Sequence, residues 1–195
     1  MICVLVGPPG SGKGTQAELL AGALSVPHVS TGDLLRAETV EGTPLGRQVA
    51  STLAAGELVP DEVIGQMLER RLRDPDAVGG VLLDGYPRTV PQARTLDALL
   101  EAAGRRVDAV LALGVDDETL VGRLQRRALE QHRTDDNPES IAERLREYRQ
   151  LTEPVIDYYR GLGTPVLEVD GTGGVGEVQG RVREALASVV NPPAW

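Results

Sequence analysis

Five short runs rich in apolar residues mark the chain. They cover residues 2–6, 26–29, 80–83, 107–113 and 164–169. These runs are mostly valine, leucine and alanine and do not alternate regularly with polar residues, which is typical of strands buried on both faces of a parallel sheet. We therefore predict five buried strands at these positions.

Between and after these runs, apolar residues recur every three or four positions, which is the spacing of one face of an α-helix. The first helix is expected from Lys13 to Leu24, and the others at residues 32–40, 44–54, 61–73, 90–103, 117–130, 138–160 and 175–189. Strands that alternate with helices predict one α/β domain, in which a five-stranded parallel sheet has helices on both faces. Such sheets bind ligands beyond the carboxyl ends of their strands.

Two stretches interrupt this alternation. Residues 30–60 contain two helical segments with no strand between them, and residues 128–137 form a polar gap between long helices. We expect each stretch to be a flap that closes over a site at the carboxyl edge of the sheet.

Composition restricts the classes of function. The 195 residues include one cysteine, which excludes an internal disulfide and a multi-cysteine zinc site. The net charge of −9 argues against general nucleic-acid binding, which needs a basic face. No signal-peptide pattern or membrane-length apolar run is found in the sequence. We expect a cytoplasmic protein with no membrane or nucleic-acid partner, whose arginines gather at any site for anions.

The basic residues are distributed unevenly between two types. Of the 20 basic residues, Lys13 is the only lysine, and it lies in the glycine-rich segment of residues 7–15. Chance is one explanation, because a glycine-rich loop with a lysine also occurs in unrelated contexts. The strand before the loop and the helix after it favour a phosphate-binding loop, in which backbone N–H groups and a compact ammonium hold phosphate oxygens.

Further chemistry is predicted at Asp84 and at several arginines. Asp84 directly follows a predicted strand, where a carboxylate suits Mg²⁺ or its bound water, although a turn or capping role is the alternative. Phosphoryl transfer also needs cations that neutralise spread negative charge. Six arginines are candidates for this task, namely Arg36, Arg88, Arg123, Arg127, Arg133 and Arg144.

Together these segments resemble the nucleoside monophosphate kinases, and specifically the adenylate kinase family with a short lid. The matching motifs follow the family's order over nearly the whole chain, at residues 7–15, 30–36, 56–59, 84–88 with Gln92, 123 with 127, 133–136 and 170–172. The resemblance implies a P-loop NTPase-type fold with a helical insertion for the nucleoside monophosphate at residues 30–59 and a short lid at residues 126–137. It implies reversible phosphoryl transfer from ATP to AMP, giving two ADP, in adenine nucleotide homeostasis. It further implies Mg²⁺ that arrives with ATP, no structural zinc, and a monomer.

The resemblance also assigns roles to residues. The ATP phosphates would contact Gly10, Ser11, Gly12, Lys13, Gly14 and Thr15, and the ATP adenine would lie between Arg127 and the segment from Gly171 to Gly173. AMP would contact Thr31, Arg36, Glu57, Leu58, Val59, Gly85, Tyr86, Pro87, Arg88, Gln92, Arg133 and Arg144, with Gln92 at the adenine edge. Catalysis would fall to Lys13, Arg88, Arg123, Arg133 and Arg144. Asp84 would hold Mg²⁺ through water, Thr15 is a second metal candidate, and Asp135 and Asp136 would hold lid arginines in the closed state.

The chain departs from the family's usual residue at position 132, and two other functions compete with the one that the resemblance implies. His132 stands where the family usually has glycine, which puts the flexibility of the lid in question. A UMP/CMP kinase is the first alternative, and a nucleotide-binding regulator that has lost turnover is the second. Thr31 and Gln92 favour AMP over a pyrimidine nucleotide by resemblance. The arginines on both sides of the transferred group favour an enzyme over a regulator.

Overall fold

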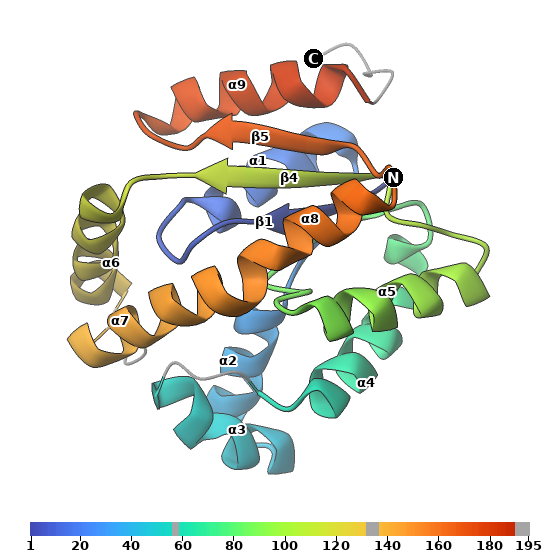
Figure 1. Cartoon of the computed structure of the whole chain (residues 1–195). Coiled ribbons are helices and arrows are strands. Elements are labelled where there is room, and N and C mark those ends of the chain that lie inside the picture. The colour runs from blue at the N-terminus through green and yellow to red at the C-terminus, as the bar shows by residue number, and fades with distance from the viewer. Residues whose placement is uncertain (56–58, 132–136, 190–195) are drawn as a thin grey trace.

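Five strands form one parallel sheet in the computed structural model, which describes residues 1–55, 59–131 and 137–189 (Figure 1). The sheet order is β2-β3-β1-β4-β5. The strands are β1 (Ile2–Val6), β2 (His28–Ser30), β3 (Val81–Asp84), β4 (Ala109–Gly114) and β5 (Val166–Asp170). The prediction of an α/β fold with a five-stranded parallel sheet is confirmed.

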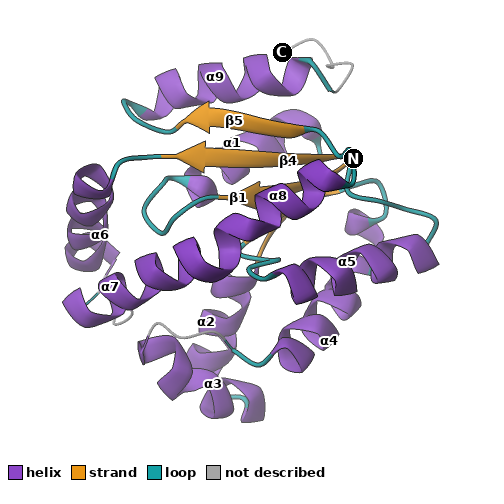
Figure 2. Cartoon of the chain, in the orientation of Figure 1, coloured by secondary structure: helices purple, strands orange, loops and turns teal. Residues whose placement is uncertain are grey.

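Helices cover both faces of this sheet, as the purple and orange elements of Figure 2 show. The α-helices are α1 (Lys13–Leu24), α2 (Thr31–Glu41), α3 (Pro44–Ala55), α4 (Asp61–Leu72), α5 (Val90–Ala102), α6 (Asp117–Gln131), α7 (Pro138–Glu147), α8 (Glu153–Gly161) and α9 (Val175–Ala187). None of them, within the residues that are described, has the length and apolar character needed to cross a membrane.

Alternate side chains of the central strand enter two separate cores. Cys3 and Leu5 of β1 pack in the cluster that includes residues of α1 and α9. Ile2, Val4 and Val6 pack in the cluster that includes residues of α5 and α8. Because successive side chains of a strand point to opposite faces, the apolar run of β1 contributes to both cores. The strand ends at the carboxyl edge of the sheet.

The predicted helix at residues 138–160 contains an irregular turn. The chain is helical from α7 into α8, but Tyr148–Thr152 between them form a π-helical turn. Pro154, in the first turn of α8, has no N–H to donate to the preceding turn, and its ring crowds a carbonyl there. A single π-helical turn within a helix accommodates such an obstruction, and the spacing of apolar residues alone did not reveal it.

The two predicted flaps are described to different extents. Of the predicted flap at residues 30–60, the described part from Thr31 to Ala55 forms α2 and α3, which follow β2 and pack against each other (Figure 1). Of the predicted lid, residues 126–131 belong to α6, and Asn137 caps α7 by accepting a hydrogen bond from the Ser140 backbone N–H at 2.9 Å. His132, Arg133, Asp135 and Asp136 lie outside the described residues.

Candidate active site

The glycine-rich loop connects β1 to α1 at the carboxyl edge of the sheet. Gly10 and Gly12 have φ values of +84° and +93°, a region that favours glycine, so the loop can bend around a small anion. The Ser11 N–H donates to the Pro8 carbonyl at 3.1 Å, and α1 begins at Lys13. The loop therefore ends at a helix N-terminus, whose N–H groups and dipole attract phosphate.

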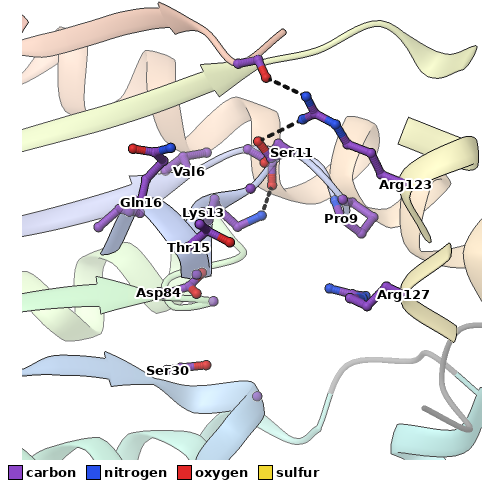
Figure 3. Close-up of a pocket in the computed structure, with 18 of the residues that line it drawn as sticks. Val6, Pro9, Ser11, Lys13, Thr15, Gln16, Ser30, Asp84, Arg123 and Arg127 are labelled. Carbon is purple, nitrogen blue, oxygen red and sulfur yellow. Dashed lines mark hydrogen bonds between the residues drawn. The ribbon is translucent and has the colours of Figure 1, made fainter. Parts of the chain in front are cut away.

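Lys13 extends back over this loop (Figure 3). Its Nζ donates to the carbonyl oxygens of Gly7 at 2.7 Å and of Pro8 at 3.0 Å. Burial lowers the pKa of Lys13 to about 8; the charge of Asp84 opposes this change, and the charges of Arg88, Arg144 and Arg127 add to it. An anionic ligand at the loop would restore the preference for the charged ammonium.

Asp84 ends β3 beside the loop, and its side chain faces Lys13 and Thr15 (Figure 3). Burial alone would raise the pKa of Asp84, but the neighbouring His28 and the charges of Lys13 and Arg88 outweigh it, so the pKa lies below its ordinary value. A carboxylate kept ionised beside a phosphate-binding loop suits Mg²⁺ that arrives with a nucleotide. Thr15 offers a hydroxyl oxygen in the same cleft. These two residues are compatible with a hydrated magnesium ion.

His28 of β2 is the neighbour of Asp84 that the sequence did not reveal. Its Nε2 lies 3.4 Å from Asp84 Oδ2, which is a long electrostatic contact. The His28 side chain is largely buried. Only the pairing of β2 with β3, where Ser30 is in register with Asp84, brings the two side chains together.

The predicted AMP residues after β3 form one turn. Gly85 has φ of +80°, and an added Cβ there would lie 2.9 Å from Thr31 Oγ1, so both backbone and space favour glycine. Arg88 Nε donates to the Gly85 carbonyl at 2.9 Å, which directs the guanidinium toward the cleft that Arg88 lines. Tyr86 is buried, and Pro87 lines the same cleft.

The remaining AMP candidates surround this turn. Thr31 is buried at the start of α2, and Arg36 on the same helix pairs with Asp33 and lines the cleft. Gln92 is buried in the first turn of α5, and Val59 is buried before α4. Glu57 and Leu58 lie outside the described residues.

One cleft of about 700 Å³ collects most of these groups. It is lined by the whole glycine loop from Gly10 to Thr15, by Asp84, Gly85, Pro87, Gly171 and Gly173, and by the six arginines Arg36, Arg88, Arg123, Arg126, Arg127 and Arg144. The protein's net charge is −9, yet cations outnumber carboxylates along the described lining. Such a site attracts a strongly anionic ligand.

Two arginines of α6 occupy different parts of the cleft. Arg123 Nη2 donates to the carbonyl oxygens of Gly171 at 3.0 Å and Gly173 at 3.3 Å, and Nη1 approaches the Ser11 carbonyl at 3.5 Å (Figure 3). Arg127 lies farther along the cleft, on the side toward Ser30 (Figure 3). The family resemblance set Arg127 across the ATP adenine from Gly171–Gly173; in the structure, Arg123 is the α6 arginine whose guanidinium contacts the carbonyl oxygens of these two glycines.

Comparison with known proteins agrees with this arrangement. The family model described as "Adenylate kinase" matches residues 5–164. The chain belongs to the adenylate kinase family. The family resemblance predicted from the sequence is thereby confirmed, as is the predicted class of enzyme, an ATP:AMP phosphotransferase.

Relatives named "Adenylate kinase" match nearly the whole chain. One from Stenotrophomonas maltophilia and one from Xanthomonas campestris are each 50% identical over 95% of this chain and 99% of the relative. One from a Nocardioides species is 48% identical over 95% of this chain and 97% of the relative. The matches extend beyond the phosphate loop that many nucleotide-binding families share, so they favour an adenylate kinase over the UMP/CMP kinase and the regulator considered from the sequence.

Proposed function

We propose that the cleft binds ATP and AMP together and transfers the terminal phosphoryl group of ATP to the AMP phosphate, giving two ADP. The observation that carries this proposal is the position of Lys13 and Arg88, which approach the same cleft from the ends of two neighbouring strands, β1 and β3. A phosphoryl group between two nucleotides needs cations on both sides, because negative charge spreads over donor, acceptor and the group in transfer.

On the ATP side, the glycine loop from Gly10 to Thr15 holds the phosphates, and Lys13 contacts the β and γ groups. The two α6 arginines take the reverse of the roles that the family resemblance implies. Arg123 touches the backbone of Gly171 and Gly173, so it is the better candidate to lie against the adenine. Arg127 then contacts the phosphoryl group in transfer instead of the adenine, together with Arg144 and Arg133.

On the AMP side, Arg88 and Arg36 bind the phosphate, while Thr31 and residues 85–87 shape the turn beneath it. Gln92 reads the edge of the adenine base, and residues 57–59 contact its nucleoside. The segment at residues 30–59 acts as the flap over AMP, and residues 126–137 act as the lid over ATP.

The metal contribution is electrostatic. Mg²⁺ bound with ATP would draw charge from the phosphate oxygens, and Asp84, through water, and Thr15 would hold it on the loop side of the cleft. The chain's own cations then align the acceptor oxygen of AMP with the terminal phosphorus. Closure of both flaps excludes water, which would otherwise accept the phosphoryl group in place of AMP.

A coupled assay with ATP and each of AMP, CMP, UMP and GMP tests this function. AMP should be the preferred acceptor by a wide margin. Preference for CMP or UMP would contradict the AMP assignment, and absence of turnover with every acceptor would contradict the enzyme. We further propose that the protein acts as a cytoplasmic monomer, and sedimentation of the purified chain with and without nucleotide tests the oligomeric state.

A further inference from the structure

The side-chain amide of Gln92 is held by two partners of opposite hydrogen-bonding character. Its Oε1 accepts a hydrogen bond from the backbone N–H of Arg88 at 2.7 Å. Its Nε2 donates to Oδ1 of Asp61, in the first turn of α4, at 2.7 Å. Gln92 itself is 3% exposed, so its amide has little access to water as a substitute partner.

These two partners determine which way the amide faces. A backbone N–H can only donate, and a carboxylate can only accept. Turning the amide by 180° would set Nε2 against the Arg88 N–H and Oε1 against the Asp61 carboxylate. Both hydrogen bonds would then be replaced by repulsive pairs, and a buried polar group without a partner is costly.

The backbone of Gln92 is also held by hydrogen bonds. A shift of α5 therefore cannot relieve the constraint on the side-chain amide. The Gln92 N–H donates to Thr89 Oγ1 at 3.2 Å, and the Gln92 carbonyl accepts from the Tyr86 hydroxyl at 3.1 Å. Tyr86 is buried with 2% exposure. Of the two partners of the amide, Asp61 is an exposed side chain on another helix, so a substitution can change it without altering the backbone around Gln92.

The fixed amide retains one lone pair on Oε1 and one N–H on Nε2. The base edge of AMP offers an amino group as donor and N1 as acceptor, which matches an amide oxygen and an amide N–H in that order. The edge of a 6-oxopurine offers the reverse, an oxygen acceptor and an N1–H donor. A 6-oxopurine would need the amide turned by 180°, and the two partners oppose that turn.

The geometry assigns Asp61 as a specificity-determining residue that acts through Gln92: it fixes the amide in the orientation that accepts a 6-aminopurine monophosphate and rejects a 6-oxopurine monophosphate. The inference rests on the proposed contact between Gln92 and the adenine of AMP. Asp61 touches no substrate in this account, so it is a positioning residue. Rejection arises from mismatched polar groups, which discriminate more strongly than differences in pocket size.

Asp61 also stands where acidic residues generally stabilise a helix, close to the N-terminus of α4. Glu62 is acidic in the same turn, and its exposed side chain accepts a hydrogen bond from Gln66 of the same helix. Glu62→Gln therefore removes the same charge from the same helix end without touching the amide. It is the matched control for Asp61→Asn.

The test compares kcat/KM for AMP with kcat/KM for IMP, which differs from AMP at the base edge and keeps the ribose and phosphate. In Asp61→Asn the Gln92 amide faces a side chain that can donate as well as accept a hydrogen bond. Only the Arg88 N–H then still fixes the orientation of the amide. The AMP:IMP ratio should fall about tenfold, corresponding to about 1.4 kcal/mol, mainly through better use of IMP. The value for AMP should stay within about threefold. Glu62→Gln should leave the ratio unchanged.

Gln92→Ala separates this inference from the function on which it rests. That variant should lose most of the AMP:IMP discrimination, and adding Asp61→Asn to it should change the ratio no further, because the two residues act as one unit. If Gln92→Ala keeps the AMP:IMP discrimination, Gln92 does not contact the adenine, and the proposed role of Asp61 is overturned as well. If Gln92→Ala loses the AMP:IMP discrimination while Asp61→Asn keeps it, only the proposed role of Asp61 is overturned. Equal losses for AMP and IMP in Asp61→Asn, with a lowered melting temperature, would also overturn it by showing a merely structural effect.

Discussion

At the residue scale, Lys13 shows why one cation type cannot replace another. Its Nζ lies between two carbonyl oxygens of the loop, at 2.7 and 3.0 Å. A compact ammonium on a thin stem can enter this space and still direct a third N–H to a ligand, whereas a planar guanidinium is wider and has a fixed fork of donors.

Lys13→Arg should therefore lower kcat by about a hundredfold or more, the usual effect of removing one well-placed donor to a developing charge. The coupled assay with ATP and AMP measures it. Arg73→Lys, at an exposed pair with Glu69, is the control for the exchange itself and should leave kcat unchanged. Turnover of Lys13→Arg within threefold of the parent, with a similar melting temperature, would show that this slot does not require lysine.

The lowered pKa of Lys13, about 8, predicts that ATP binding takes up a proton. Near pH 8 about half of the free enzyme would carry an uncharged Lys13, and the bound phosphates would raise this pKa and recharge the group. Affinity for ATP should then fall as the pH rises above 8. Calorimetry at pH 8 in two buffers of different ionisation enthalpy should give an uptake of about half a proton per ATP.

Lys13→Met supplies the comparison for that experiment, because it removes the titrating group and leaves the rest of the loop. The proton uptake should disappear in this variant. An unchanged uptake would assign the proton to another group of the complex.

At the element scale, α5 and α8 are joined by a polar contact within an apolar interface. Asp97 of α5 accepts hydrogen bonds from the hydroxyls of Tyr158 at 2.7 Å and Tyr159 at 3.3 Å, both on α8. The two rings meet edge to face at 5.2 Å between centroids, and the Arg94 guanidinium lies 5.9 Å from the Tyr158 centroid. This contact holds the helix that continues through the π-helical turn into α7, which carries Arg144.

Asp97→Ala should lower the free energy of unfolding by about 1–3 kcal/mol, because it leaves the fully buried Tyr159 hydroxyl without its acceptor. For a chain of this size the melting temperature should fall by several degrees. Asp97→Asn keeps an acceptor oxygen and should lose distinctly less. Equal losses in both variants would mean that the negative charge, not the hydrogen bonding, stabilises the interface.

The order of elements could be predicted from the sequence, whereas contacts between elements could not. Apolar runs located all five strands. The prediction of burial is confirmed for β1, β3 and β4, which are buried over nearly their whole length, and was wrong for β2 and β5, which are partly exposed because they form the two edges of the sheet. Local spacing placed Arg123 and Arg127 on one side of a helix, but which arginine meets Gly171 depends on how α6 approaches the loop after β5. His28 met Asp84, and Gln92 met Asp61, only through strand pairing and the packing of α4 beside α5.

At the scale of the whole molecule, charge is separated between surface and cleft. The acidic chain keeps Lys13 and six arginines along one cavity. Four of those cations lie on α1, α6 and α7, namely Lys13, Arg123, Arg127 and Arg144. Two others approach from α2 and from the turn after β3, namely Arg36 and Arg88. The sequence predicted this gathering because a net negative protein can bind a polyphosphate only at a locally positive site.

Two nucleotide sites in one cleft predict tight binding of two adenosines joined by five phosphates. Once one adenosine is bound, the other is confined near its own site, so the second contact forms at a high effective concentration. The compound should bind at one equivalent and at least about a hundredfold more tightly than AMP. It should compete with both ATP and AMP, as calorimetry and inhibition kinetics would show. Binding no tighter than AMP, or competition with one substrate alone, would contradict the two-site cleft.

The single lysine has a practical consequence for watching this cleft work. If the protein is produced with isotope-labelled lysine, the spectrum contains one labelled side chain, and it is the one hydrogen-bonded to Gly7 and Pro8. No assignment experiment or mutation is needed to recognise its signal. The shift of that one resonance with pH, nucleotide or temperature would report directly on the occupancy of the phosphate loop in the unmodified enzyme.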